Sequence, residues 1–273
     1  MVLTAGSRPV RPGALTGRTI VVTRPERQAG ALVELIHRAG GTPVVFPVLE
    51  ILEVDDPGPL VALCGRLAQF DLAIFISPNA VQKAMDLISA HGGFPPGLRA
   101  ATVGKGSAAE LRRLGIADVI APSKRFDSEA LLELPEMHAV AGKHIVIFRG
   151  DGGRELLGDT LVARGATVEY AACYRRSKPG ADAAPLLRLW SRDELSGCVI
   201  TSSEGLRNLW EMVGPAGRVW LEQTLLFVPH PRVAETARAL GSTRVVLTGP
   251  NDEGVLEGMI AWWSEGHAPR RPV

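Results

Sequence analysis

Short apolar runs alternate along this chain with longer stretches whose apolar residues recur every three or four positions. The runs "TIVV" and "HIVIF" are rich in Val, Ile and Phe, and helical spacing follows each of them, as in Leu32, Leu35 and Ile36. A regular alternation of short strands with helices predicts parallel sheets covered by helices on both faces. The pattern therefore predicts an α/β protein.

The alternation is repeated at a constant distance along the chain. The segment that starts at Arg18 matches the one that starts at Lys143 without a gap, at an offset of 125 residues (145 − 20 for Ile20 and Ile145). We expect a slip of one residue only at "ADVIAP", which matches "TRVVLTGP". A register that persists over about a hundred residues indicates an internal duplication in which each copy has the size of a domain. Further matched pairs are Arg24 and Arg149, Ser77 and Ser202, and Val103 and Val228.

Length and composition agree with two domains and narrow the class of protein. The chain has 273 residues, and 30 basic against 29 acidic side chains leave a charge of +1, so no global field attracts nucleic acid or a membrane surface. The three cysteines lie far apart without zinc-ligand spacing, which favours buried thiols in a reducing compartment. No signal peptide or apolar run of about 18 residues is found. We expect a cytoplasmic protein with flexible termini at 1–17 and 266–273.

The candidate ligand-binding residues lie at the six predicted strand ends. In open α/β sheets ligands bind outside the carboxyl ends of the strands. Free N–H groups at helix starts, together with a few cations, favour carboxylates or phosphates there. The candidates are Thr23, Arg24, Ser77, Asn79, Gly104, Lys105, Ser107, Arg149, Gly150, Gly152, Ser202, Ser203, His230 and Arg232.

Several of these candidates also have a purely structural interpretation. The stretch "RGDGGREL" lacks the GxGxxG spacing, so a flexible turn or a backbone anion cradle is favoured over a dinucleotide site. Arg24 and Arg149 either fork a carboxylate or pair with neighbouring acids such as Glu26 and Asp151. The serines that follow strands either hold a ligand or cap helices, and no GxSxG motif indicates a catalytic serine.

One tyrosine is a candidate general acid. Tyr174 stands in "CYRR", where an aromatic hydroxyl lies beside two cations; the alternative is an edge-strand aromatic residue next to solvated arginines. Four acidic residues precede or open the last helix of each copy, and we interpret them as helix caps rather than as a metal cluster. They are Asp127, Glu129, Asp252 and Glu253.

Taken together, the strand ends resemble those of the uroporphyrinogen-III synthase family over residues 18 to 262. The resemblance lies in "VVTRP", "FISPNAV", "VGKGSAAEL", "FRGDGGREL", "YRR", "ITSSEGL", "PHPRVAETA" and "DEGVLEGM". It implies two flavodoxin-like domains with a ligand cleft between them, made of residues 18–48 with 178–265 and of residues 50–172. It also implies a two-stranded β connector made of "VFPVLEI" and "YAACYRR".

The resemblance further implies an activity. Enzymes of this family are lyases that convert hydroxymethylbilane, a linear tetrapyrrole with eight carboxylates, into uroporphyrinogen III. The last ring, ring D, is inverted and water is lost, without metal or cofactor, in the biosynthesis of haem, sirohaem and cobalamin. Tyr174 would assist departure of the hydroxyl group, and Thr23, Ser77 and Ser202 would hold carboxylates. His230 stands where the family commonly has Ser or Thr.

The resemblance leaves partners and one rival function open. A monomer is expected, with a possible transient hand-over of substrate from hydroxymethylbilane synthase. The rival is a non-catalytic two-domain binding module that closes around an anionic metabolite. The position of Tyr174 favours the synthase. A response-regulator function is disfavoured because the strand ends are basic or neutral.

Overall fold

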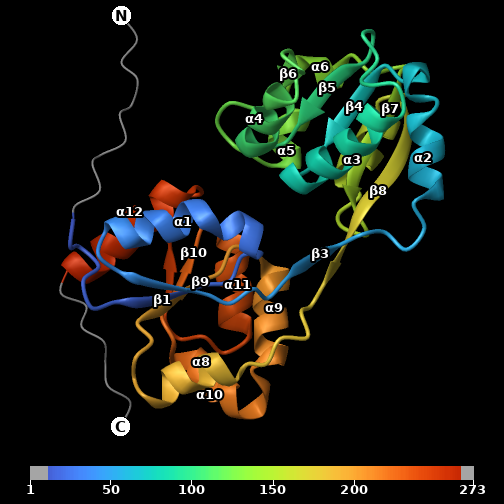
Figure 1. Ribbon diagram of the computed structural model, residues 1–273. Coiled ribbons are helices and arrows are strands. Elements are labelled where there is room, and N and C mark those ends of the chain that lie inside the picture. Colours follow the sequence, from blue (N-terminus) through green and yellow to red (C-terminus); the bar gives the residue numbers. More distant parts are fainter. Residues whose placement is uncertain (1–11, 266–273) are drawn as a thin grey trace, which may run out of the picture. The chain divides into compact units, whose positions relative to one another are not determined.

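The computed structural model describes residues 12–265 of the chain, which form two compact units. Unit 1 runs to Glu50 and resumes at Ser177, and unit 2 is Ile51–Arg176. In Figure 1 the blue start and the orange-to-red end of the chain therefore share unit 1. The predicted domain boundaries, residues 48–50 and 172–178, lie beside these two crossings. The expected flexible terminus at 266–273 and the first eleven residues lie outside the described part of the chain.

Unit 1 is built on a five-stranded sheet in which neighbouring strands are parallel. Its strands are β1 (Thr19–Val22), β2 (Thr42–Val45), β9 (Gly197–Val199), β10 (Leu226–Val228) and β11 (Val245–Leu247). They lie in the order β11-β10-β9-β1-β2. Counted along the chain within the unit, this is the order 2-1-3-4-5 of flavodoxin-like folds.

Helices cover both faces of this sheet. They are α1 (Glu26–Arg38), α8 (Ala184–Ser191), α9 (Ser203–Met212), α10 (Gly214–Gln223), α11 (Pro231–Ala239) and α12 (Asp252–Ser264). Ile20 and Val22 pack in one apolar cluster with α1 and α12, whereas Val21 packs in another with α9 and α11. Successive side chains of a strand point to opposite faces, so β1 contributes to both clusters.

Unit 2 contains a six-stranded sheet in the order β3-β8-β7-β4-β5-β6. Its strands are β3 (Glu50–Leu52), β4 (Leu72–Phe75), β5 (Arg99–Thr102), β6 (Val119–Ile120), β7 (His144–Gly150) and β8 (Thr167–Ser177). The pairs from β8 to β6 are parallel. Strands β3 and β8 are neighbours and hold the two points where the chain changes units, so they correspond to the connector that the resemblance implied.

The helices of unit 2 also divide between two faces. They are α2 (Gly58–Cys64), α3 (Pro78–Ala90), α4 (Lys105–Arg113), α5 (Ser128–Leu132), α6 (Pro135–His138) and α7 (Leu156–Ala163), with a 3-10 turn at Leu67–Gln69. Phe75 and Phe148 stack at 4.9 Å between ring centroids in the cluster formed with α2, α3 and α4. Ile74 and Ile147 pack on the opposite face with α5 and α7. Both faces are therefore dry, as a parallel sheet requires.

The two copies of the duplication exchange strands between the units. By the predicted offset β7 corresponds to β1, β8 to β2, and β9 to β4. Unit 1 thus combines β1 and β2 of the first copy with β9, β10 and β11 of the second, and unit 2 combines β4, β5 and β6 with β7 and β8. If β7 is counted first, unit 2 has the same 2-1-3-4-5 order with β3 added at its edge.

The predicted position of the slip is wrong. Ala73 pairs with Ala100 in unit 2, and Cys198 pairs with Leu226 in unit 1, so the offset is 125 at β4 (198 − 73) but already 126 at β5 (226 − 100). Helices α4 and α11 also start 126 residues apart. The extra residue therefore lies before β10, and Val228 corresponds to residue 102 rather than to Val103.

The predicted flexible arm is wrong for its last residues. Leu15 is fully buried in the cluster of α1 and α12, and its N–H donates to the Ala39 carbonyl at 2.8 Å. A Cβ on Gly41 would lie 3.1 Å from the Leu15 Cβ, so Leu15 is tightly packed where α1 ends. Burying a leucine side chain contributes about 1.5–3 kcal/mol, which fixes this turn to unit 1.

Candidate functional site

The carboxyl ends of the parallel strands of unit 2 form one edge of its sheet. Ser77 follows β4, Gly104 follows β5, and Gly150 ends β7, while Tyr174 lies beside Gly150 in the last part of β8. Because neighbouring strands are parallel, these ends meet at the same edge. The structure therefore brings together four of the residues that the sequence singled out.

A direct side-chain contact at this edge joins Tyr174 to Ser77. The Tyr174 Oη lies 3.0 Å from the Ser77 Oγ, and either oxygen can be the donor. Ser77 is also the N-cap of α3, because its Oγ accepts the Ala80 N–H at 3.1 Å. The phenol therefore sits at the positive end of a 13-residue helix. The predicted helix cap, Ser77, and the predicted general acid, Tyr174, are thus in direct contact.

Gly150 provides the space for the Tyr174 ring. The pairing of β7 with β8 shifts between Arg149 and Gly150, so Gly150 stands opposite Tyr174. A Cβ at Gly150 would lie 2.6 Å from a ring carbon, and Tyr174 itself is only 4 % exposed. The glycine is thus explained by close approach of an aromatic ring, not by an unusual backbone angle.

Arg149 closes the turn after β7 instead of offering a free guanidinium. Its Nε donates to the Gly152 carbonyl at 3.1 Å and its Nη2 donates to the same oxygen. The guanidinium also lies 4.8 Å from the centroid of the Tyr170 ring, and the residue is 7 % exposed. Gly152 has φ +64°, which suits a glycine in a tight turn. Asp151, the acidic neighbour that the sequence suggested as a partner, accepts the Arg176 N–H at 2.9 Å.

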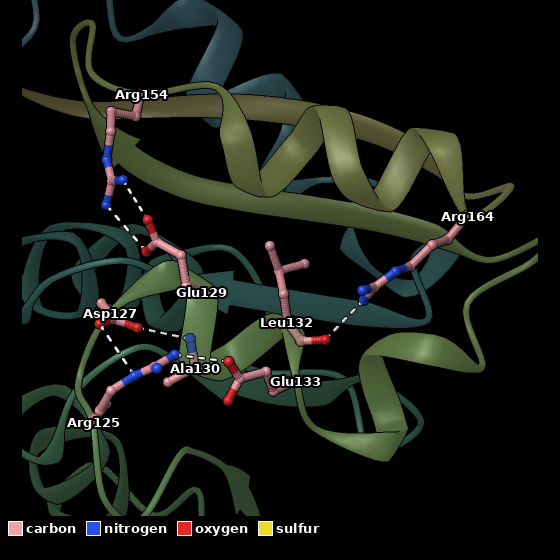
Figure 2. A network of polar contacts seen from close by, with 8 residues as sticks. All are labelled: Arg125, Asp127, Glu129, Ala130, Leu132, Glu133, Arg154 and Arg164. Carbon is pink, nitrogen blue, oxygen red and sulfur yellow. Dashed lines mark hydrogen bonds and ion pairs between the residues drawn. The ribbon is translucent and has the colours of Figure 1, made fainter.

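The following loop is fastened to α5 by an ion pair, shown in Figure 2. Asp127 caps α5 by accepting the Ala130 N–H at 2.7 Å, and Glu129 in its first turn receives the Arg154 guanidinium at 2.6 Å. Arg154 holds the pKa of Glu129 below its ordinary value, mainly through this hydrogen bond. Asp127 and Glu129 therefore have the structural roles expected from the sequence.

Figure 2 also shows how the other end of α5 is satisfied. Arg164 Nη1 donates to the Leu132 carbonyl at 2.9 Å, and Arg125 pairs with Glu133 at 2.8 Å. The last carbonyls of a helix have no partner within it, so the guanidinium of Arg164 completes this short helix. The network supports the turn that carries Arg149 without containing a candidate acid or base.

The remaining candidates of unit 2 divide by exposure. Lys105 is exposed and its Nζ lies 4.9 Å from the centroid of the Phe126 ring, while Gly104 caps α4 without a side-chain acceptor. Asn79 lies in the first turn of α3 and is half-buried. Ser107 is only 2 % exposed on the packed side of α4, so the structure does not bring it to the strand edge with the others.

The strand ends of unit 1 hold a second set of candidates, whose hydroxyl groups are mostly engaged. Ser202 caps α9 through the Gly205 N–H at 2.9 Å. Thr23 is 3 % exposed and donates to the Val199 carbonyl at 2.8 Å. Ser203 donates to the Arg232 carbonyl at 3.3 Å and accepts from Thr236 Oγ1 at 2.9 Å. These contacts hold the end of β1 to β9 and hold α9 to α11.

Two exposed basic candidates remain in unit 1. His230 occupies the N-cap position of α11 without a side-chain capping bond, and Arg232 lies in the first turn of that helix. Arg24, in contrast, pairs with Asp252 at the start of α12, a partner that the sequence did not indicate. The only hint was the acidic first turn of α12.

The described residues offer neither a reactive thiol, nor a metal-binding cluster, nor a membrane-spanning helix. All three cysteines are free and buried, and burial raises the pKa of Cys173 and Cys198 to about 12, so neither thiol is a nucleophile near neutral pH. No group of three His, Cys, Asp or Glu side chains within residues 12–265 could hold a metal ion. Over the same residues, every helix is too short or too polar to cross a membrane.

Comparison with known proteins decides the family. The family model described as "Uroporphyrinogen-III synthase HemD" matches residues 30–257. The chain belongs to the uroporphyrinogen-III synthase family. The uroporphyrinogen-III synthase of Salmonella typhimurium is 36 % identical over 240 residues, covering 87 % of this chain and 98 % of that protein. The enzyme of Escherichia coli K12 is 35 % identical with the same coverage.

Solved uroporphyrinogen-III synthases share the fold. A mutant of the enzyme from Thermus thermophilus aligns with a TM-score of 0.61 at 18 % identity, covering 91 % of this chain and 99 % of that one. The Helicobacter pylori enzyme aligns with a TM-score of 0.58 at 15 % identity, covering 89 % and 99 %. The predicted α/β fold of two domains is therefore confirmed. At these identities the likeness concerns the fold alone.

Proposed function

We propose that this chain catalyses the reaction of its family, in tetrapyrrole biosynthesis, as a hydro-lyase. The substrate is hydroxymethylbilane, and the product is uroporphyrinogen III with its last ring inverted. The match to the Salmonella enzyme over 87 % of this chain and 98 % of that protein supports the same activity. The observation that carries the proposal is the Tyr174 hydroxyl, 3.0 Å from Ser77 at the N-terminus of α3.

The strand edges suit a ligand that carries many carboxylates. Helix α4 begins without a side-chain capping bond, so its first N–H groups remain donors for an anion. Helix α11 begins with Pro231, which has no N–H, and its Val233 N–H donates to the His230 carbonyl at 3.0 Å, so basic side chains are the main anion-binding groups there. Exposed Lys105, His230 and Arg232 stand beside these helix starts. We assign carboxylate binding to these groups, and a structural role to the buried Thr23 and Ser107.

Tyr174 supplies the acid. As the C–O bond of the terminal hydroxymethyl group breaks, Tyr174 donates its proton to the departing hydroxyl, which leaves as water. The resulting azafulvene is attacked by the substituted carbon of the last pyrrole ring, which gives a spiro intermediate. Reopening and closure of that ring in the inverted sense release a proton from carbon and restore the phenol. Atoms balance with loss of one water.

The residues around Tyr174 need not include a nucleophile. The bilane closes without help to the wrong isomer, so the enzyme contributes chiefly by holding the chain in one arrangement. The helix start at α3 favours the negative charge that develops on the phenol oxygen. This environment therefore assists the departure of the hydroxyl group without a covalent intermediate.

The decisive experiment generates hydroxymethylbilane in place with its own synthase and adds this protein. The products are oxidised and separated by chromatography, with a reaction lacking this protein as the reference for unaided closure. We expect isomer I without the protein and isomer III with it. Isomer I alone from a folded sample would contradict the proposed function and favour a binding module for an anionic metabolite.

A further inference from the structure

The Tyr174 side chain is fixed from two directions. On one side the Ser77 Oγ lies 3.0 Å from its hydroxyl, and on the other the ring fills the space that Gly150 leaves open. The ring belongs to the buried cluster of α2, α3 and α4, so it has little freedom to turn. A phenol held in this way has its hydroxyl group at a defined point at the start of α3.

Comparison of the two copies separates the helix-capping role of Ser77 from its contact with Tyr174. Ser77 and Ser202 occupy equivalent positions and cap α3 and α9 with similar backbone angles, φ −158° and −145°. At the 125-residue offset, however, Tyr174 corresponds to Leu49 and Gly150 to Pro25. Capping by serine therefore occurs in both units, whereas the glycine and the tyrosine are found together only in unit 2.

The hydrogen bonds of Ser77 indicate which group donates in its contact with Tyr174. The Ser77 Oγ already accepts the Ala80 N–H at 3.1 Å, and its own proton remains available for the phenol oxygen. If Ser77 donates to Tyr174, the proton of Tyr174 is left for the substrate. The same donor then stabilises the charge on the phenol oxygen after that proton has gone.

We propose that Ser77 is a positioning residue for Tyr174, and that Gly150 is the complementary space that lets the ring reach it. Ser77 donates a hydrogen bond to the phenol oxygen and keeps its own proton throughout. This inference rests on the proposed function, and it replaces the predicted role of Ser77 as a carboxylate ligand.

The first test measures the rate of isomer III formation in Ser77→Ala. We expect kcat to fall on the order of tenfold with KM little changed, because the acid is misplaced while substrate binding is kept. Ser77→Thr should restore most of the rate, since threonine keeps the hydroxyl and also caps helices. A rise in KM at unchanged kcat would overturn the proposal in favour of direct substrate binding.

The control for lost capping is Asn251→Ala. Asn251 caps α12, which has 13 residues like α3, by accepting the Gly254 N–H at 2.9 Å, and it belongs to unit 1, whereas both tyrosines belong to unit 2. This variant should lose a similar amount of stability and keep the wild-type kcat. An equal fall of kcat in both variants would make the Ser77 effect one of stability and overturn the proposal.

A double variant tests whether Ser77 acts through Tyr174. We expect Ser77→Ala/Tyr174→Phe to be no slower than Tyr174→Phe alone, because the residue that Ser77 positions is already lost. Multiplied effects of the two changes would overturn the proposal. Gly150→Ala should also lower kcat, whereas Gly97→Ala should not, since no atom lies within 4 Å of a Cβ at Gly97.

A spectroscopic measurement tests the contact without substrate. The chain contains two tyrosines, so tyrosine labelled with ¹³C at Cζ gives two resonances, and Tyr170→Phe assigns them. Ser77→Ala should shift the Tyr174 resonance, and Asn251→Ala should leave it in place. An unmoved resonance in Ser77→Ala would overturn the proposal. Absence of isomer III from the wild type would instead contradict the proposed function alone.

Discussion

Arg24 and Asp252 join the two chain segments that make up unit 1. The Arg24 Nη1 lies 2.5 Å from the Asp252 Oδ1, although 228 positions separate the residues. Their side chains are 17 % and 19 % exposed. Since Arg24 follows β1 and Asp252 begins α12, the pair fastens the first strand to the last helix.

Arg24→Ala should lower the free energy of unfolding of unit 1 by about 1–3 kcal/mol, because it leaves a partly buried carboxylate without its partner. All five tryptophans lie between Trp190 and Trp263, so tryptophan fluorescence in urea follows this unit. The double variant Arg24→Ala/Asp252→Ala should cost less than the sum of the single changes. Strict additivity would show that the two side chains do not interact. Glu34→Ala, which removes the exposed pair with Arg38 at 3.8 Å, is the control with little expected effect.

Tyr174→Phe should slow isomer III formation by at least several-fold, because it removes the hydroxyl group and keeps the ring that fills the space beside Gly150. The thermal unfolding midpoint should change little. Tyr170→Phe is the matched control, since the Tyr170 hydroxyl donates to the Glu155 carbonyl at 3.4 Å rather than contacting Ser77. Equal rates for wild type and Tyr174→Phe would remove Tyr174 from the mechanism.

Arg149→Ala should raise KM on the order of tenfold, equivalent to about 1.4 kcal/mol, because the turn that its guanidinium closes stands beside Tyr174. Steady-state kinetics of isomer III formation measure this change. The stability of unit 2 should also fall. Arg113→Ala removes only an exposed pair with Glu110 on α4 and should leave KM unaltered. An unaltered KM in Arg149→Ala would mean that the turn has no part in substrate binding.

Asp71 should contribute to stability in a pH-dependent manner. Its carboxylate accepts from Lys143 Nζ and the His144 N–H, both at 2.9 Å, and these bonds hold its pKa below the ordinary value. As pH falls, Asp71 is therefore protonated at a higher pH in the unfolded chain than in the folded protein. The contribution is complete above about pH 5, where the unfolded carboxyl is ionised, and is lost as pH falls through the lower folded pKa. Urea unfolding of Asp71→Asn, followed by circular dichroism, should show a weaker decline below pH 5 than the wild type. Parallel pH profiles would contradict this role.

The buried thiols should resist modification in the folded protein. Burial raises the pKa of Cys173 and Cys198 to about 12 and also raises that of Cys64. At pH 8 a disulfide reagent should therefore react slowly with the native chain and rapidly with three thiols in guanidinium. Because unfolded thiols ionise near pH 8.5, their contribution to stability is complete below that pH and is lost as pH rises toward 12. Fast reaction of any thiol in the native protein would indicate local opening.

The sequence predicted the fold better than it predicted side-chain partners. The constant offset identified the duplication, but it misplaced the slip because strands buried on both faces carry no alternation that fixes their register. The identity of Val103 with Val228 therefore favoured a register one residue away from the one that the two sheets show. The buried Leu15 was missed since a single leucine among prolines and glycines gives no periodic signal.

Partners far apart in sequence account for the remaining differences. Asp252 and Arg24 meet only because α12 packs on α1, and Ser77 meets Tyr174 only because β8 and β4 flank β7. No local spacing encodes such contacts. Residues capping their own helices, such as Asp127, Ser77 and Ser202, were predictable because the acceptor and the N–H lie three positions apart.

The exchange of strands between the copies sets an order of events during synthesis. Unit 2 is one continuous segment, so it can fold as soon as β8 has left the ribosome. Strand β1 must wait for β9, since Val21 pairs with Cys198, 177 residues later (198 − 21). At about 5–20 residues per second this is a delay of roughly 9–35 s. Strand β1 can pair with β2 early, but its other edge and the apolar side chains that pack with α12 stay uncovered until the last segment of the chain has been made.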